Sequence, residues 1–321
     1  MASEQTIRIG YVPEHYLAPL HLALRHPNAQ SLPYKISLIP FPSGTGHMIT
    51  SLRANEIDVA IGLTEGWVAG LAGKQAPAAP EERGYNVVGH WVDTPLRWAI
   101  VTGRKRDELN GVKDLEGGRV GISRLGSGSH IMSFVLAQQQ GWKSSSLSPV
   151  VTGPFGALRD GVTGNNLEAG KPSSEFFMWE HFTTKPWFHA TSSKPDPELK
   201  KIGEIFTPWP SWLIVASSSV FPTPEKDERL DSLFKLLDEG VKEFKRDLGN
   251  VVKLLGTGEL GCHYGEEDAS KWIKDVRFAE GVRGVDAGVV GNVVDVLKVA
   301  GVIDQSLEKN EAIERVIGIG R

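Results

Sequence analysis

The sequence GVKDLEGGRVGISRLGSGSHIMSFVLAQQQGW, residues 111–142, decides the fold class. Its apolar run at Arg119–Ser123 predicts a β-strand, and the periodicity from about Ser129 to Gln140 predicts a helix. A turn of small residues, Ser127-Gly128-Ser129, separates the two. A strand that passes through a short turn directly into a helix is the repeating unit of parallel α/β sheets.

The same alternation begins at the N-terminus. We expect strands at residues 7–11, 34–40, 58–62 and 86–91, and helices at about 19–25, 46–55 and 66–72. From about residue 225 onward the chain is expected to be helical, with amphipathic segments at 228–246 and 286–300. The pattern predicts an α/β protein with largely parallel sheets flanked by helices.

The composition is that of an ordinary globular protein. The 321 residues are enough for two domains or one large one, and a net charge of -4 with dispersed Lys and Arg argues against nucleic acid as a partner. The sequence contains no run of about 18 apolar residues, so membrane insertion is not predicted. The N-terminus shows no leader pattern, so a cytoplasmic location is expected. The single cysteine, Cys262, excludes an intrachain disulfide and a cysteine-cluster metal site.

Two pairs of similar segments favour a two-lobed plan. PLRWAIVTG (95–103) and PSWLIVASS (210–218) both place a proline and then a tryptophan before an apolar strand. In residues 51–71 and again in 157–187, a helix end, a turn and a buried strand are followed by polar side chains.

In residues 51–71 the buried strand is followed by the polar residues Thr64 and Glu65. In residues 157–187 the buried strand ends in Trp179 and Glu180. Parallel α/β sheets bind ligands beyond the carboxyl ends of their strands. One such end from each lobe is therefore predicted to face the other across a cleft.

The turn at Ser127-Gly128-Ser129 has several interpretations. A P-loop is excluded because no lysine follows the glycines, and a dinucleotide fingerprint lacks its third glycine, since Ile131 stands there. What remains is a helix N-terminus whose free N–H groups favour an anion. The alternative is simple helix capping by Ser127 or Ser129.

The first lobe offers a similar turn in FPSGTGHMITSL (41–52). Gly44, Thr45 and Gly46 precede a helix that is expected to start near His47, and two capped helices are again the alternative. His47 and His130 are predicted to occupy equivalent places, each shortly after its turn. Either histidine could donate to an anion or act as acid or base, but surface or capping roles are open for both. Glu65 is a further candidate acid or base.

Known metal and hydrolase motifs are not found. The histidines do not have the spacing of a zinc motif, and no G-x-S-x-G segment is present, so we expect no metal and no cofactor. Aromatic residues gather where the cleft is predicted, and one or two could stack on a flat heterocyclic ligand.

The order of these segments resembles the type 2 periplasmic-binding-protein fold, in the branch near the thiamine-pyrimidine, aliphatic-sulfonate and nitrate binding proteins. Within that branch the chain looks most like a fungal intracellular group known from Candida. Leu52, Asn55 and Asp58 match the family's helix-turn-strand pattern. The second lobe's opening strand is matched by Asp114, Leu115, Gly117, Val120 and Gly121.

The resemblance implies two lobes, 1–97 plus 213–321 and 98–212, joined by two crossing strands with a ligand cleft between them. It implies ligand contacts from five places, namely Tyr16, the Gly44–His47 turn, Thr64, the turn of Ser127, Gly128, Ser129 and His130, and the Trp179–Glu180 pair. Bacterial members are exported, and the pyrimidine synthases of this fold use iron and a cysteine-rich run. With one cysteine, this chain is not expected to share that chemistry.

The sequence therefore predicts an intracellular protein that closes on a small anionic or heterocyclic metabolite, with a link to thiamine-pyrimidine metabolism as one option. The alternative is an enzyme on the same scaffold that acts on a thiamine-pyrimidine or related vitamin precursor. His47, Glu65 and His130 are then the candidate catalytic residues. The oligomeric state is left open.

Overall fold

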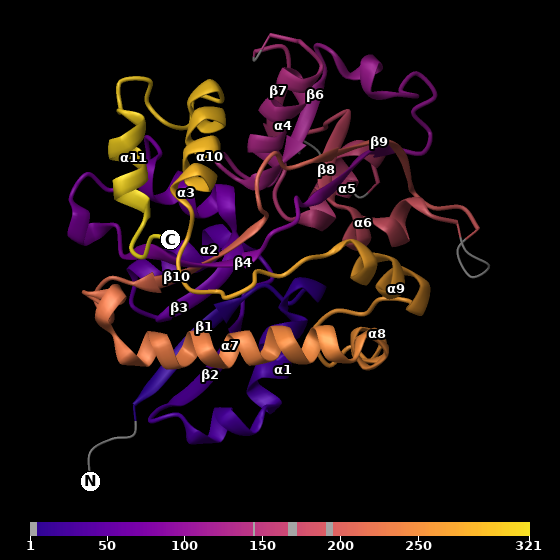
Figure 1. Cartoon of the computed structure of the whole chain (residues 1–321). Coiled ribbons are helices and arrows are strands. Elements are labelled where there is room, and N and C mark those ends of the chain that lie inside the picture. The colour runs from indigo at the N-terminus through magenta and orange to yellow at the C-terminus, as the bar shows by residue number, and fades with distance from the viewer. Residues whose placement is uncertain (1–4, 144, 166–171, 191–194) are drawn as a thin grey trace. The chain divides into compact units, whose positions relative to one another are not determined.

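A computed structural model describes residues 5–143, 145–165, 172–190 and 195–321. The chain divides into two compact units (Figure 1). Unit 1 comprises residues 1–94, 209–294 and 303–321, and unit 2 comprises residues 95–208 and 295–302. The boundaries predicted from the sequence, 97/98 and 212/213, lie within a few residues of these, but 295–302 had been expected in the first lobe.

Unit 1 is built on a five-stranded sheet of order β2-β1-β3-β10-β4. Its strands are β1 (Thr6–Tyr11), β2 (Lys35–Pro40), β3 (Val59–Leu63), β4 (Tyr85–Val92) and β10 (Trp212–Ser217). Its helices are α1 (Ala18–Arg25), α2 (Thr45–Arg53), α3 (Thr64–Ala72), α7 (Glu228–Arg246), α8 (Leu248–Gly256), α9 (Glu266–Asp275) and α11 (Lys309–Val316), with α10 (Ala287–Val299) running on into the segment grouped with unit 2.

Unit 2 has a second five-stranded sheet, of order β7-β6-β8-β5-β9. Its strands are β5 (Arg97–Gly103), β6 (Arg119–Ile122), β7 (Ser148–Val151), β8 (Phe176–Glu180) and β9 (Leu199–Phe206). Its helices are α4 (Gly128–Gln139), α5 (Phe155–Thr163) and α6 (His181–Phe188). Short 3-10 turns at His15–Leu17, Pro27–Ser31, Pro80–Glu82, Val112–Leu115 and Pro224–Lys226 complete the two units.

The two sheets have equivalent strand orders, which confirms the two-lobed plan. β1, β2, β3, β10 and β4 of unit 1 correspond in order to β6, β7, β8, β5 and β9 of unit 2. The similar segments at 95–103 and 210–218 form β5 and β10, the first strand after each passage of the chain between the units. The segments 51–71 and 157–187 contain the equivalent strands β3 and β8, and so their similarity has a structural basis.

The expectation of mostly parallel sheets is confirmed, with one strand in each sheet that runs against the other four. In unit 1, β1 pairs in parallel with β2 and β3, whereas β10 pairs antiparallel with β3 and β4. Unit 2 repeats this arrangement, with β5 antiparallel to β8 and β9. The strand that follows each passage between the units enters its sheet against the direction of the βαβ strands. An antiparallel strand needs no crossover helix before it. The alternation of helices and strands along the sequence therefore does not reveal the direction of β5 or β10.

The chain crosses between the units at residues 94–95 and again at residues 208–209. Hydrogen bonds within each unit join the two crossing segments. In unit 2, the N–H of Leu96 donates to Oγ1 of Thr207 at 2.9 Å, and the N–H of Thr207 donates to the Leu96 carbonyl at 3.1 Å. In unit 1, the hydroxyl and the N–H of Ser211 both donate to the Thr94 carbonyl, at 2.7 and 3.2 Å. Each passage is therefore tied to the other at both ends.

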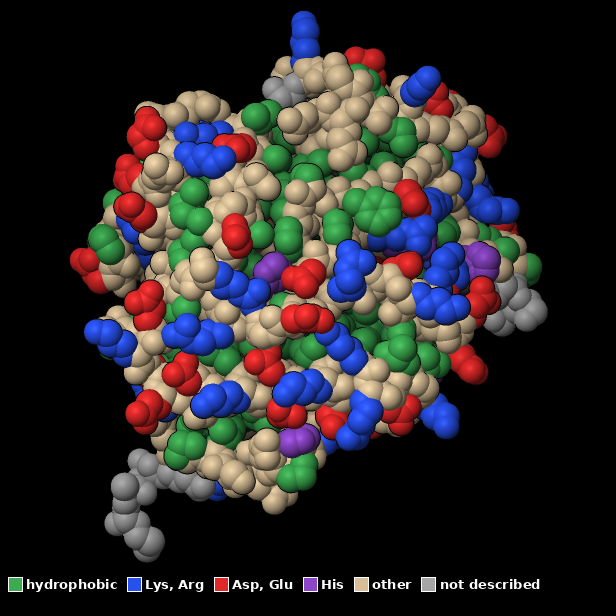
Figure 2. Space-filling model, in the orientation of Figure 1, with side chains coloured by type: hydrophobic (Ala, Val, Ile, Leu, Met, Phe, Trp, Pro, Cys, Tyr) green, Lys and Arg blue, Asp and Glu red, His purple; other side chains and the backbone are tan. Residues whose placement is uncertain are grey.

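Helix α7 shows how the amphipathic C-terminal pattern is used. Its apolar face packs on α1, where Gly240 lies against Pro19 and Ala23 with no room for a side chain (Figure 1). Its outer face carries Lys, Arg, Asp and Glu in mixed order, and Figure 2 shows both signs interspersed over this region. No helix of the described residues is long and apolar enough to cross a membrane.

Candidate functional site

The predicted residues of unit 1 lie at one edge of its sheet. Tyr16 follows β1, the Gly44–His47 turn follows β2, and Thr64–Glu65 follows β3. These three strands are parallel neighbours, so their carboxyl ends meet at the same edge. The structure therefore brings together the unit 1 residues that the sequence singled out.

Glu65 is the most unusual of them. Its carboxyl group is fully buried in the first turn of α3, where one oxygen, Oε2, accepts a hydrogen bond from the indole N–H of Trp209 at 3.1 Å. The other oxygen, Oε1, has no hydrogen-bond partner among the described residues. Loss of hydration raises the pKa of Glu65 to about 7, against the opposing effect of its own backbone N–H and of Trp209.

Thr64 fixes the start of α3 to the passage that returns to unit 1. Its hydroxyl donates to the Pro210 carbonyl at 2.6 Å, and its N–H donates to the Ser211 carbonyl at 3.0 Å. Because the Thr64 hydroxyl is buried and engaged in this way, its observed role is structural.

Tyr16 lies in an aromatic cluster at the same edge. Its ring stacks on Trp212, with centroids 5.4 Å apart, and meets the edge of Trp272 at 5.4 Å. His15 packs between Tyr16 and Trp272, and burial lowers the pKa of His15 to about 3. His15 is therefore neutral at physiological pH.

The Gly44–His47 turn forms the N-terminus of α2. Gly44 adopts φ 78°, a left-handed conformation that favours glycine. The Thr45 side chain turns inward and accepts a hydrogen bond from the Leu63 N–H at 3.0 Å, whereas His47 is exposed against Phe41. The N–H groups of Thr45 and Gly46 have no hydrogen-bond acceptor within the described chain.

In unit 2, the Ser127–His130 turn caps α4. The Ser127 hydroxyl accepts from the His130 N–H at 3.4 Å, so capping by Ser127 is confirmed, whereas the Ser129 hydroxyl does not cap the helix and accepts from the Ser123 N–H at 3.1 Å. The ring of His130 is held by the Gly126 N–H, which donates to Nδ1 at 3.0 Å. Burial lowers the pKa of His130, because loss of hydration disfavours the charged ring.

Capping leaves donors at the tip of α4 unused. The N–H groups of Gly128 and Ser129 have no acceptor within the described chain, and they point out of a twelve-residue helix. The carbonyl of Arg124, in the same turn, accepts from the Ser127 N–H at 3.2 Å, but its guanidinium forms no ion pair or hydrogen bond with any described residue, and loss of hydration lowers its pKa. Arg124 was missed from the sequence, although it stands three residues before Ser127 and its charge could have been noticed.

Trp179 and Glu180 end β8 at this same edge of unit 2. Glu180 caps α6, and its Oε2 accepts from the Thr183 N–H at 2.6 Å. Burial raises the pKa of Glu180 to about 7, as for Glu65, although Glu180 is the last residue of β8 and corresponds to Leu63, whereas Glu65 lies in the first turn of α3. Trp179 points to the other face and packs on Phe155.

The predicted equivalence of His47 and His130 is wrong. α2 follows β2 at the sheet edge, whereas α4 follows β6, whose equivalent in unit 1 is β1. The turn before α4 therefore corresponds to the segment that contains Tyr16, not to the Gly44–His47 turn. The two turns resemble each other because any helix N-terminus benefits from small and capping residues, wherever it lies in the topology.

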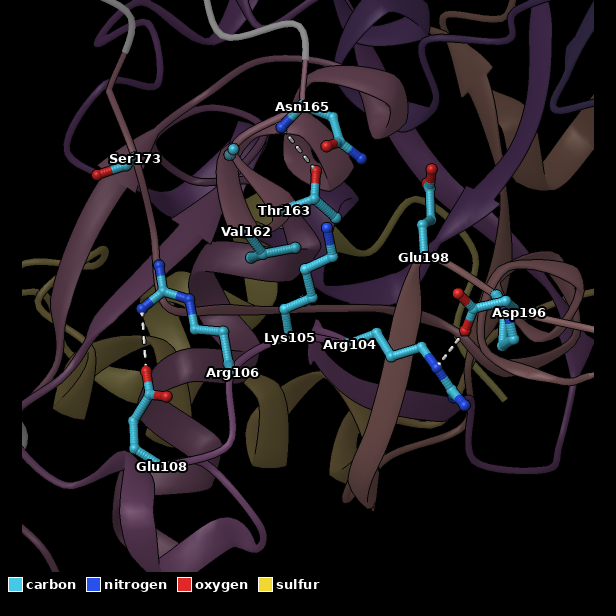
Figure 3. Close-up of a pocket in the computed structure, with 14 residues that line it drawn as sticks. Arg104, Lys105, Arg106, Glu108, Val162, Thr163, Asn165, Ser173, Asp196 and Glu198 are labelled. Atoms are coloured by element: carbon cyan, nitrogen blue, oxygen red, sulfur yellow. Dashed lines mark hydrogen bonds and ion pairs between the residues drawn. The ribbon is translucent and has the colours of Figure 1, made fainter.

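A charged pocket of about 630 Å³ lies at the opposite end of the unit 2 sheet (Figure 3). It is lined by the turn after β5 and by the end of α5. Arg104 pairs with Asp196 at 2.6 Å, and Arg106 lies 3.5 Å from Glu108. None of the residues predicted from the sequence lines it. No group of three or more metal-ligating side chains is found among the described residues.

Comparisons with known proteins agree with this architecture. The family model described as Ca3427-like PBP matches residues 98–205. The Candida albicans CA3427 gene product, described as defining a new family with the generic periplasmic binding protein fold, is 31% identical, with a TM-score of 0.82 over 98% of this chain and 97% of that one. No curated protein sequence matches.

More distant structures share the fold. The alkanesulfonate-binding protein SsuA from Xanthomonas axonopodis pv. citri, bound to MOPS, is 17% identical, with a TM-score of 0.70 over 98% of this chain and 99% of that one. The periplasmic nitrate-binding protein NrtA from Synechocystis PCC 6803 is 12% identical, with a TM-score of 0.68 over 98% and 86%.

The two equivalent units and the two passages between them define a two-lobed periplasmic-binding-protein fold, which is a scaffold for binding small molecules. Within it, this chain belongs to the Ca3427-like family.

Proposed function

We propose that this protein binds a small anionic metabolite at the sheet edges that carry the predicted residues. The observation that carries this proposal is the tip of α4. Two unused N–H groups, the positive end of a helix and a guanidinium without a described carboxylate partner belong to one turn. Such a group of donors favours a carboxylate, sulfonate or phosphate.

Unit 1 has its own set of groups that suit such a ligand. Its Thr45 and Gly46 N–H groups are unused, and the ring cluster around Tyr16 offers aromatic faces. An anion attached to a flat or apolar group suits this combination. A thiamine-pyrimidine compound is therefore one option for the ligand, and an intracellular location remains part of the proposal.

A thermal-shift screen tests the proposal. The probes are MOPS, nitrate, inorganic phosphate and the free thiamine pyrimidine, because a ligand that binds the folded state raises the melting temperature. We expect at least one anionic probe to stabilise the protein and to be recovered unchanged by mass spectrometry.

Arg124→Ala should abolish this stabilisation. Arg104→Ala is the matched control, because Arg104 is an exposed arginine of the same unit at the opposite end of the sheet. Equal responses of the two variants, or no response of the wild type to any anion, would refute the proposal.

An enzyme on this scaffold is the second candidate function. The observation in its favour is the buried Glu65 carboxyl, whose pKa of about 7 suits a general acid or base at neutral pH. If a stabilising ligand is converted to a product, Glu65→Gln should abolish turnover while the thermal shift remains. Recovery of every stabilising ligand unchanged would leave binding as the function.

A further inference from the structure

Two tryptophans occupy equivalent positions in the two sheets. Trp98 stands at the start of β5, directly opposite Glu180, the last residue of β8. Trp212 starts β10, opposite Leu63, the last residue of β3. Because β5 and β10 run against these strands, their first residues lie at the carboxyl edge of each sheet, where the candidate site residues are found.

Both indole groups are buried donors without an acceptor. Trp98 is 3% exposed and Trp212 is 1% exposed, and within the described residues neither indole N–H has a hydrogen-bond partner. Other buried tryptophans are satisfied, since Trp91 donates to the Tyr16 carbonyl at 2.9 Å and Trp209 donates to Glu65. A buried donor normally finds a partner, so two equivalent exceptions call for an explanation.

Trp98 also shares a face with the tip of α4. Side chains alternate along a strand, and Ala99, Val101 and Phe177 pack with α5 on one face of the unit 2 sheet. Trp98 and Glu180 are therefore directed to the other face, where α4 packs on β6 and β8. The Trp98 indole and the unused N–H groups of α4 thus share the same edge and the same face.

Trp212 has a comparable setting in unit 1. It stacks on Tyr16, which follows β1, the strand equivalent to β6. Trp67 and Trp272 also lack a described acceptor, but they lie in helices α3 and α9 and have no equivalent in unit 2.

We propose that the indole N–H groups of Trp98 in unit 2 and Trp212 in unit 1 are ligand donors, and that each of them favours a ligand with acceptor oxygens. The inference rests on the proposed binding of an anion. A neutral indole donor adds direction without adding charge, so it favours an oxyanion over a spherical anion of equal charge. Sulfonate, carboxylate and phosphate groups all meet this requirement.

The test follows the indole N–H resonances of protein labelled with nitrogen-15, during titration with MOPS and, separately, with chloride. The Trp98→Phe and Trp212→Phe variants assign the two signals. We expect both signals to move downfield with MOPS and to stay in place with chloride. We also expect each variant to bind MOPS up to about tenfold more weakly, the effect of one neutral hydrogen bond.

Trp67→Phe is the matched control, because Trp67 is equally buried and also lacks an acceptor. It should bind MOPS within about twofold of the wild type. If MOPS binds and Arg124→Ala weakens it, while the Trp98 and Trp212 signals stay in place, the inference is overturned and the proposed function stands. If no anion shifts any resonance or the melting temperature, both fail.

Discussion

The buried carboxyl of Glu65 should make the protein less stable as the pH rises toward neutrality. An acid whose pKa is raised by folding binds its proton more tightly in the folded state. Stability is therefore greatest below the unfolded pKa of 4.5, declines through the window up to about 7, and is constant above it. Glu65→Gln removes this titration while keeping the size of the side chain and an acceptor for Trp209.

The magnitude follows from the two pKa values. A rise from 4.5 to about 7 corresponds to roughly 3 kcal/mol of unfolding free energy lost by the time the carboxyl is ionised. The carboxyl is fully buried, so solvent does not screen this effect. Glu65→Gln should therefore match the wild type near pH 4 and exceed its stability at pH 8 by up to about 3 kcal/mol.

Urea denaturation followed by circular dichroism, at intervals from pH 4 to pH 8, provides the measurement. Glu180→Gln is the parallel variant, because burial also raises the pKa of Glu180 to about 7. Each single variant should remove part of the decline, and the double variant should remove most of it. If Glu65→Gln loses stability with pH as steeply as the wild type, the carboxyl is not desolvated and the reasoning is wrong.

Two further predictions concern stability and reactivity. Gly240→Ala should destabilise unit 1 by about 1–3 kcal/mol in the same urea assay, because the new methyl would overlap the Pro19 carbonyl and lie 2.7 Å from Cβ of Ala23; an unchanged midpoint would contradict the close approach of α7 to α1. Burial raises the pKa of the Cys262 thiol to about 12, so iodoacetamide at pH 8 should label the native protein at least about tenfold more slowly than the urea-unfolded chain, and equal rates would show an exposed thiol.

Much of the fold could be predicted from residues close together in the sequence. The strand and the helix predicted in residues 119–140 are β6 and α4. Ser127 caps α4, as expected from the capping interpretation of this turn. The similar segments at 95–103 and 210–218 were correctly paired, because each repeats the same local pattern and each forms the strand after a passage between units.

The candidate site was predicted less completely. The Gly44–His47 turn and Glu65 were placed at a sheet edge because a polar or small residue follows a buried strand, whereas Tyr16 came from the family resemblance, and their contacts with a ligand stay a prediction. Arg124 and Trp98, which we propose as ligand donors, were not among the residues predicted from the sequence. A single arginine, or a tryptophan in an apolar strand, has no local pattern that separates a ligand donor from an ordinary surface or core residue.

The sequence by itself determined the local units of this protein, because helix capping, turns and hydrophobic periodicity act over a few residues. Only the tertiary structure decided that β5 and β10 run antiparallel, that α4 corresponds to α1 rather than α2, and that Glu65 and Trp98 are buried. These properties arise from strand pairing and packing between residues far apart in the chain. The direction of strand pairing, the burial of a side chain and the pKa of a buried carboxyl depend on residues that are distant in the sequence, so a short segment does not reveal them.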